Sequence, residues 1–176
     1  YFLCLAVMSL FYRDHLPYFI LSIPFLGNFS HAFGVAIPHG PGVFWSLCVE
    51  EHFYLLWPIV VLSFDRRLLT IAAASIVLIT PVLRGAGVLA GMEIDAAVYQ
   101  YSFFRFDGLA TGSLIAIFVR SSLANAKTAV WVALAMVAGC IVVTILGLPF
   151  QILKKSVAGV ALRYTQVNLL FGAMIL

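Results

Sequence analysis

The sequence predicts an all-α protein, a polytopic transmembrane helix bundle with about six to seven spanning segments in 176 residues. Hydrophobic residues make up 64% of the chain and charged residues 10%, whereas soluble domains are roughly half apolar and about a quarter charged. The mean hydropathy is +1.10. This composition excludes a soluble globular enzyme and a disordered protein. A net charge of +3 without a basic cluster also excludes a nucleic-acid-binding module.

The apolar stretches give the order of the expected helices, since a spanning helix needs about 20 largely apolar residues. Residues 1–12 have the composition of the end of a spanning helix. The next stretch, 18–37, contains Asn28 and is therefore either a helix that faces the bundle interior or a broken helix. Two prolines and two glycines predict a turn at 38–42.

The later stretches predict five more helices, at residues 43–64, 68–83, 102–119, 128–148 and 157–176. A polar connection over 84–101 and loops at 121–127 and 149–155 separate the last four of them. The chain begins and ends inside apolar stretches, so we expect residues 1–176 to be part of a larger membrane domain that continues on both sides.

The helix expected at 43–64 contains unusual polar residues for a membrane segment. Ser46, Glu50 and Tyr54 have the spacing i, i+4 and i+8, which places them on one helix face. Ionisable groups at membrane depth usually face a cavity or a partner, so we expect Glu50 to point into the bundle. The alternative is that Glu50 and Glu51 lie near the headgroups and only complement the helix macrodipole.

A second polar group stands at the start of the stretch 102–119. Arg105 and Asp107 precede a glycine pair, Gly108 and Gly112, whose spacing allows another helix to approach closely. These residues predict a buried polar cluster. The alternative is that Arg105 extends to the lipid headgroups.

Buried charges are costly when they are unpaired. We therefore expect Glu50 or Glu51 to lie within ion-pair reach of Arg105, or to be joined to it through one polar side chain. The sequence has no HExxH motif and no Cys/His ligand spacing, so we expect no metal site.

Three strings in the sequence resemble one family. Residues 44–58, FWSLCVEEHFYLLWP, closely resemble the pattern WSLSVEEQFYLLWP of the type-3 membrane acyltransferases, with His52 where the pattern usually has Gln. Residues 104–109, with the glycine and alanine that follow, resemble the family stretch FRLDALLLGALLA, and residues 25–29 resemble FLQNF. The resemblance covers nearly the whole chain.

The resemblance implies a multi-pass protein of the inner (plasma) membrane. Members of the family O-acylate lipopolysaccharide, peptidoglycan precursors, exopolysaccharides, Nod factors and macrolides. The chain would transfer an acyl group, in the first instance acetyl, from acyl-CoA to a hydroxyl of a cell-surface carbohydrate. Acyl-CoA is then a donor substrate and no cofactor stays bound. The expected partners are membrane lipid, acyl-CoA and a carbohydrate or glycolipid acceptor, with no nucleic acid.

The resemblance also suggests which residues act. The catalytic candidates are Glu50, Glu51 and Arg105. The substrate-binding candidates are Trp45, Ser46, His52, Tyr54, Asp107 and Asn28. The His and Arg that the family carries on its first helix would lie before Tyr1, so we expect the 176 residues alone not to turn over acyl-CoA. In that scheme Glu50 orients the missing His, as a carboxylate does in a catalytic triad.

Two other functions fit the same polar residues. Glutamates with arginine and aspartate partners inside a membrane are also typical of a proton-coupled transporter or exporter, although the sequence shows no internal repeat. A structural subunit, in which the polar groups only hold helices together, is the third possibility.

Overall fold

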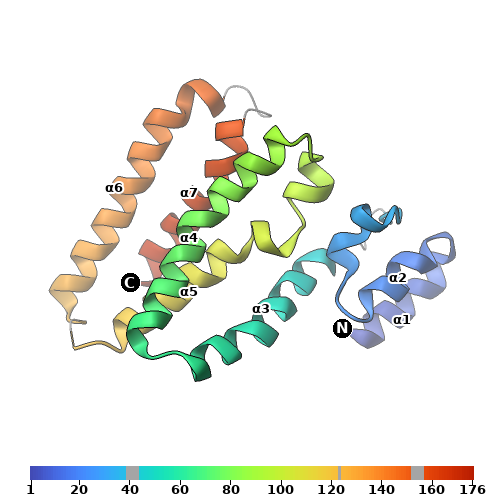
Figure 1. Cartoon of the computed structure of the whole chain (residues 1–176), viewed down its shortest axis with the longest axis horizontal. Helices are drawn as coiled ribbons and strands as arrows, with labels where there is room; N and C mark the ends of the chain where they lie inside the picture. Colours follow the sequence, from blue (N-terminus) through green and yellow to red (C-terminus); the bar gives the residue numbers. More distant parts are fainter. Residues whose placement is uncertain (39–43, 123, 152–156) are drawn as a thin grey trace.

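The protein is described here by a computed structural model that covers residues 1–38, 44–122, 124–151 and 157–176. All regular elements in these ranges are helical, so the predicted all-α class is confirmed for them (Figure 1). The α-helices are α1 (Phe2–Phe11), α2 (Leu16–Ser22), α3 (Phe44–Ser63), α4 (Arg66–Leu89), α5 (Phe106–Val119), α6 (Ala126–Gln151) and α7 (Val157–Ile175). Short 3-10 turns occupy Arg13–His15, Gly27–Phe33 and Ser102–Phe104, and a π-helical turn occupies Ile94–Val98.

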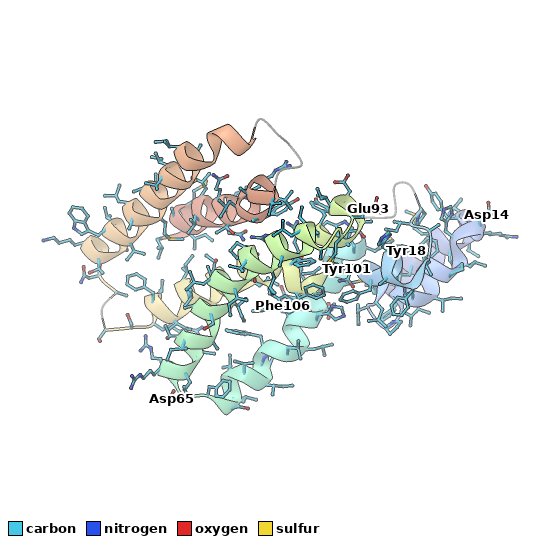
Figure 2. All side chains as sticks on the ribbon, turned by 45° about the horizontal axis from the view of Figure 1, so that its top comes forward. Asp14, Tyr18, Asp65, Glu93, Tyr101 and Phe106 are labelled. Atoms are coloured by element: carbon cyan, nitrogen blue, oxygen red, sulfur yellow. The ribbon has the colours of Figure 1, made fainter. Side chains whose placement is uncertain are left out.

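The helices form two packed groups that α3 joins. α4, α5, α6 and α7 pack against one another, while α1 and α2 pack with the turn at Gly27–Phe33 (Figure 1). In Figure 2, Asp14 and Tyr18 lie in the group with α1 and α2, and Asp65 lies at the far end of α3. The start of α3 therefore lies between the two groups, and its end lies beside α4.

Two helices in the described ranges, α3 and α4, are long and apolar enough to cross a membrane. The prediction of six to seven spanning segments was too high by this criterion. α5 has 14 residues and rises about 21 Å, which is shorter than the roughly 30 Å hydrocarbon core. α1 has 10 residues and α2 has 7, so both are shorter still.

The apolar stretch 18–37 is a broken helix, which was one of the two predicted alternatives. α2 ends at Ser22, Phe25 adopts a left-handed backbone conformation with φ of 63°, and the chain continues as a 3-10 turn from Gly27. Pro24 lacks the N–H group that would extend the helix. The turn predicted at 38–42 falls largely on residues outside the described ranges.

α4 is longer than the predicted stretch 68–83. Asp65 caps its start, because Oδ1 accepts a hydrogen bond from the backbone N–H of Leu68 at 2.8 Å. The helix then continues through Pro81 and Arg84 to Leu89. The polar connection predicted to begin at residue 84 therefore begins at residue 90, and Arg84 lies within the packed group of helices.

The boundaries near α5 and α6 also differ from the predictions. Residues 102–104 form a 3-10 turn and Arg105 is the N-cap of α5, so the helix begins four residues later than predicted. α6 extends over Ala126–Gln151, beyond the predicted 128–148. Of the loop predicted at 149–155, the first three residues are helical and the others lie outside the described ranges.

Candidate functional site

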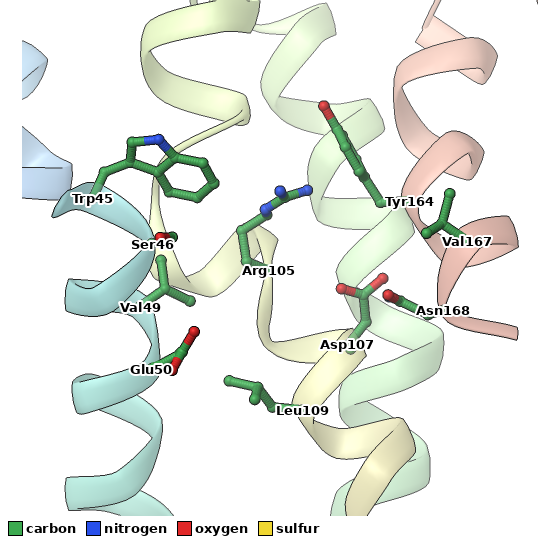
Figure 3. Close-up of a pocket in the computed structure, with 11 residues that line it drawn as sticks. Trp45, Ser46, Val49, Glu50, Arg105, Asp107, Leu109, Tyr164, Val167 and Asn168 are labelled. Atoms are coloured by element: carbon green, nitrogen blue, oxygen red, sulfur yellow. The ribbon is translucent and has the colours of Figure 1, made fainter. Parts of the chain in front are cut away.

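A pocket of about 280 Å³, lined by charged, aromatic and aliphatic side chains, lies between the start of α3, the start of α5 and the middle of α7 (Figure 3). α3 contributes Trp45, Ser46, Val49 and Glu50. The other walls are Arg105, Asp107, Gly108 and Leu109 at the start of α5, with Tyr164, Val167 and Asn168 from α7. Both segments that resemble the acyltransferase patterns therefore contribute side chains to one pocket. We call it the Glu50 pocket.

Arg105 is held by aromatic rings rather than by a carboxylate. Its guanidinium carbon lies 4.1 Å from the ring centre of Tyr164, 4.7 Å from that of Tyr99 and 5.3 Å from that of Trp45. Each distance is within the range of a cation–π interaction. The rings fix the position of a half-buried cation without neutralising its charge, so that charge still acts on whatever enters the pocket.

Glu50 is half-buried and lines the same pocket, as predicted for a side chain that points into the bundle (Figure 3). The direct ion pair predicted with Arg105 is absent: neither Glu50 nor Glu51 lies within 4.0 Å of an arginine, lysine or histidine nitrogen in the described part of the chain. The physical reason is that Tyr99, Tyr164 and Trp45 surround the guanidinium and stabilise it instead.

Asp107 pairs with a different arginine. Arg84 is fully buried, and its Nη2 donates hydrogen bonds to Asp107 Oδ2 at 2.8 Å and to Thr165 Oγ1 at 2.7 Å. Arg84 also donates to the backbone carbonyls of Phe104 and Ala161 at 2.9 and 3.1 Å. These bonds connect α4, the start of α5 and α7 directly behind the Glu50 pocket. The predicted buried polar cluster is therefore present, but its cation is Arg84.

Two predicted substrate-binding residues lie in a separate network. His52 Nδ1 is 2.6 Å from Ser102 Oγ, and Asn28 Nδ2 donates to the same hydroxyl at 2.8 Å. Asn28 also donates to the carbonyl of Gln100 at 3.3 Å. The network joins the turn at Gly27–Phe33 to α3 and to the segment before α5. It does not line the Glu50 pocket.

Tyr54 and Glu51 also lie outside the pocket. Tyr54 is 56% exposed, so the predicted stripe of Ser46, Glu50 and Tyr54 does not form one buried face. Each step of four residues turns about 40° beyond a full helical turn, and Tyr54 has therefore rotated by about 80° from Ser46. Glu51 is half-buried and does not line the pocket.

The predicted close helix approach occurs at one of the two glycines. A Cβ atom at Gly108 would lie 3.0 Å from Asn168 Oδ1 on α7, whereas a Cβ at Gly112 would meet no atom within 4 Å. Gly108 thus lets Asn168 enter the wall of the pocket.

Sequence reasoning missed several residues around the pocket. Tyr164 and Asn168 lie in the apolar stretch 157–176, and their polar groups within that stretch could have indicated that this face of the helix lines a site. Tyr99 and Arg84 were assigned to a connecting segment.

A pocket with two carboxylates, one guanidinium and flanking aromatic rings can orient a base and stabilise developing negative charge. No group of three or more His, Cys, Asp or Glu side chains with metal-binding geometry occurs among the described residues. Compared with models of known families, with curated proteins and with solved structures, the chain matches none of them.

Proposed function

We propose that this protein is a multi-pass membrane O-acyltransferase that transfers an acyl group, in the first instance acetyl, from acyl-CoA to a hydroxyl of a cell-surface carbohydrate. The observation that carries the proposal is the Glu50 pocket. Residues 44–58 and 104–109 resemble two acyltransferase patterns, and Glu50 and Arg105 of these segments, 55 positions apart in the sequence, line this one pocket.

The reaction would need three things from the pocket. The acceptor hydroxyl must lose its proton to a base while its oxygen attacks the thioester carbon; the C–S bond then breaks and the thiolate leaves. Glu50 is placed to orient such a base, or to take the proton itself. Arg105 keeps its positive charge within the pocket, where it can stabilise the oxyanion of the tetrahedral intermediate or a phosphate of the donor.

The remaining walls fit a carbohydrate acceptor. Trp45 and Tyr164 offer flat ring surfaces, and Ser46 and Asn168 offer polar atoms for hydroxyl groups. The lengths of α3 and α4 support the membrane location of the proposal.

The test measures acyl transfer by membranes from cells that express the protein containing residues 1–176. Labelled acetyl-CoA is supplied and mass spectrometry measures acetyl groups on the surface glycans. We expect Glu50→Gln to lower transfer by about 100-fold or more, the usual effect of losing acid–base assistance. Asp14→Asn is the matched control, because this carboxylate is exposed and lies at the far end of the other helix group.

Arg105 provides a second variant at the same site. We expect Arg105→Lys to retain a small part of the transfer and Arg105→Gln to retain less, because lysine keeps the charge but lacks the planar group that stacks on Tyr164. Unchanged transfer in Glu50→Gln would contradict the proposal. If proton-coupled efflux were lost instead, the transporter would be the correct function.

A further inference from the structure

A second pocket lies at the opposite end of α3 from the Glu50 pocket. It has a volume of about 320 Å³ and lies between the end of α3, the start of α4 and the end of α5. Its wall includes Trp57 and Val61 from α3, Arg66 and Leu69 from α4, and Ile117 and Arg120 from α5. We call it the Arg66 pocket. The function proposed above makes no use of it.

Two arginines converge on the Arg66 pocket from different helices. Arg66 is the first residue of α4, and its Nη2 donates to the carbonyl of Ile117 at 2.7 Å. This carbonyl is one of the last four of α5, which have no partner within the helix. The bond therefore satisfies the end of α5 and holds the Arg66 guanidinium at the pocket. Arg120, the C-cap of α5, lies on the same wall.

The charged side chains that line this pocket are both positive. No acidic residue lines it. The neighbouring Asp65 has Oδ1 hydrogen-bonded to the N–H of Leu68. A basic pocket between helix ends favours an anionic group, and guanidinium groups bind phosphate through paired hydrogen bonds.

Apart from the arginines and Ser113 the wall is apolar, and the same parts of α3 and α4 carry exposed apolar side chains. Ile59 and Leu62 of α3 are 61% and 87% exposed, and Leu68 of α4 is 49% exposed. Trp57 faces the pocket near the end of α3, and tryptophan is enriched where a helix reaches the membrane surface. A free anion gains nothing from contact with apolar side chains. A phospholipid can place its phosphate beside the arginines and its acyl chains against the apolar side chains.

We propose that Arg66 and Arg120 bind the phosphate group of an acidic membrane phospholipid, with its acyl chains against α3 and α4. This inference rests on the membrane location proposed above, but not on acyl transfer. Lipid retention and acyl transfer are measured separately, and Glu50→Gln should retain lipid normally. Failure of one proposal is therefore distinguishable from failure of the other.

The experiment places the full chain in nanodiscs of phosphatidylcholine and phosphatidylglycerol and uses native mass spectrometry to measure which lipid remains bound. We expect phosphatidylglycerol to be enriched on the unmodified chain. Each arginine near an anionic membrane contributes about fivefold, so Arg66→Gln with Arg120→Gln should weaken retention by about 30-fold. Arg67→Gln is the matched control, because this arginine is adjacent in sequence and does not line the pocket.

Arg120→Gln alone keeps the hydrogen bond between Arg66 and Ile117, and its helix content is checked by circular dichroism. The Arg120→Gln variant should weaken phosphatidylglycerol retention by about fivefold. This single variant tests the proposal if the double variant does not fold. Equal retention of phosphatidylglycerol by the unmodified chain and a folded Arg120→Gln variant would overturn the proposal. Retention of phosphatidylcholine as strong as that of phosphatidylglycerol would also overturn the proposal. Displacement of the lipid by inorganic phosphate would overturn it too, because it would identify a site for free phosphate.

Discussion

Replacing Arg84 with Met tests the role of the buried ion pair behind the Glu50 pocket. Arg84 is fully buried, Asp107 is 2% exposed, and their closest nitrogen and oxygen atoms are 2.8 Å apart. Met fills much of the space but leaves the carboxylate of Asp107 without its cation. Breaking a buried pair in this way costs about 3–5 kcal/mol in soluble proteins. The carbonyls of Phe104 and Ala161 also lose their donors, at about 1 kcal/mol each.

We therefore expect Arg84→Met to lower the free energy of unfolding by about 4 kcal/mol or more. The assay is chemical denaturation of the purified chain in detergent, followed by circular dichroism. Adding Asp107→Leu removes the stranded carboxylate and should restore about 2 kcal/mol, which a double-mutant cycle measures. Arg67→Met, at an exposed arginine of the same helix, should change stability by less than about 0.5 kcal/mol. A loss below about 1 kcal/mol in Arg84→Met, or additive effects of the two changes, would refute the reasoning.

Two further predictions use matched pairs of variants. Gly108→Ala should be less stable than Gly112→Ala by about 1 kcal/mol in the same denaturation assay, because both gain helix propensity but only the Cβ at position 108 would press on Asn168. His52→Leu should cost about 1–3 kcal/mol, because it leaves the buried Ser102 hydroxyl with one partner fewer, and His52→Gln should restore most of that loss. Equal stabilities within either pair would contradict the corresponding contact.

The sequence predicted the structure best where the length of an apolar stretch and the position of the polar residues that interrupt it indicated the same helix boundary. The stretch 43–64 was predicted within one residue of α3, because aromatic and aliphatic residues continue to the turn at Asp65. The break in 18–37 was one of two alternatives, since the polar residue Asn28 lies inside the apolar stretch. Glu50 was placed correctly toward the other helices, because burying a lone carboxylate against lipid would be costly.

The rest depended on contacts between helices that one sequence does not show. An arginine in an apolar stretch usually indicates the end of a helix, so the predicted helix stopped before Arg84. In the structure α4 continues, because Phe104, Asp107 and Thr165 accept hydrogen bonds from the Arg84 guanidinium. Ion pairing was predicted for Arg105 from charge alone, whereas its contacts are the rings of Tyr99, a short way before it in the sequence, and of Tyr164 on the distant helix α7. The number of spanning helices was overestimated because apolar composition does not reveal how short α1, α2 and α5 are.

The length of α5 fixes the separation of the two pockets. Arg105 stands immediately before its first residue and Arg120 immediately after its last, so about 21 Å of helix lies between the two guanidinium-bearing positions. A ligand anchored at Arg120 must be extended over roughly that distance to reach Glu50, and a compact ligand stays at one end. Inserting or deleting one helical turn in α5 would change this reach by about 5 Å. The helix therefore limits which molecules can contact both ends of the bundle, independently of the side chains in either pocket.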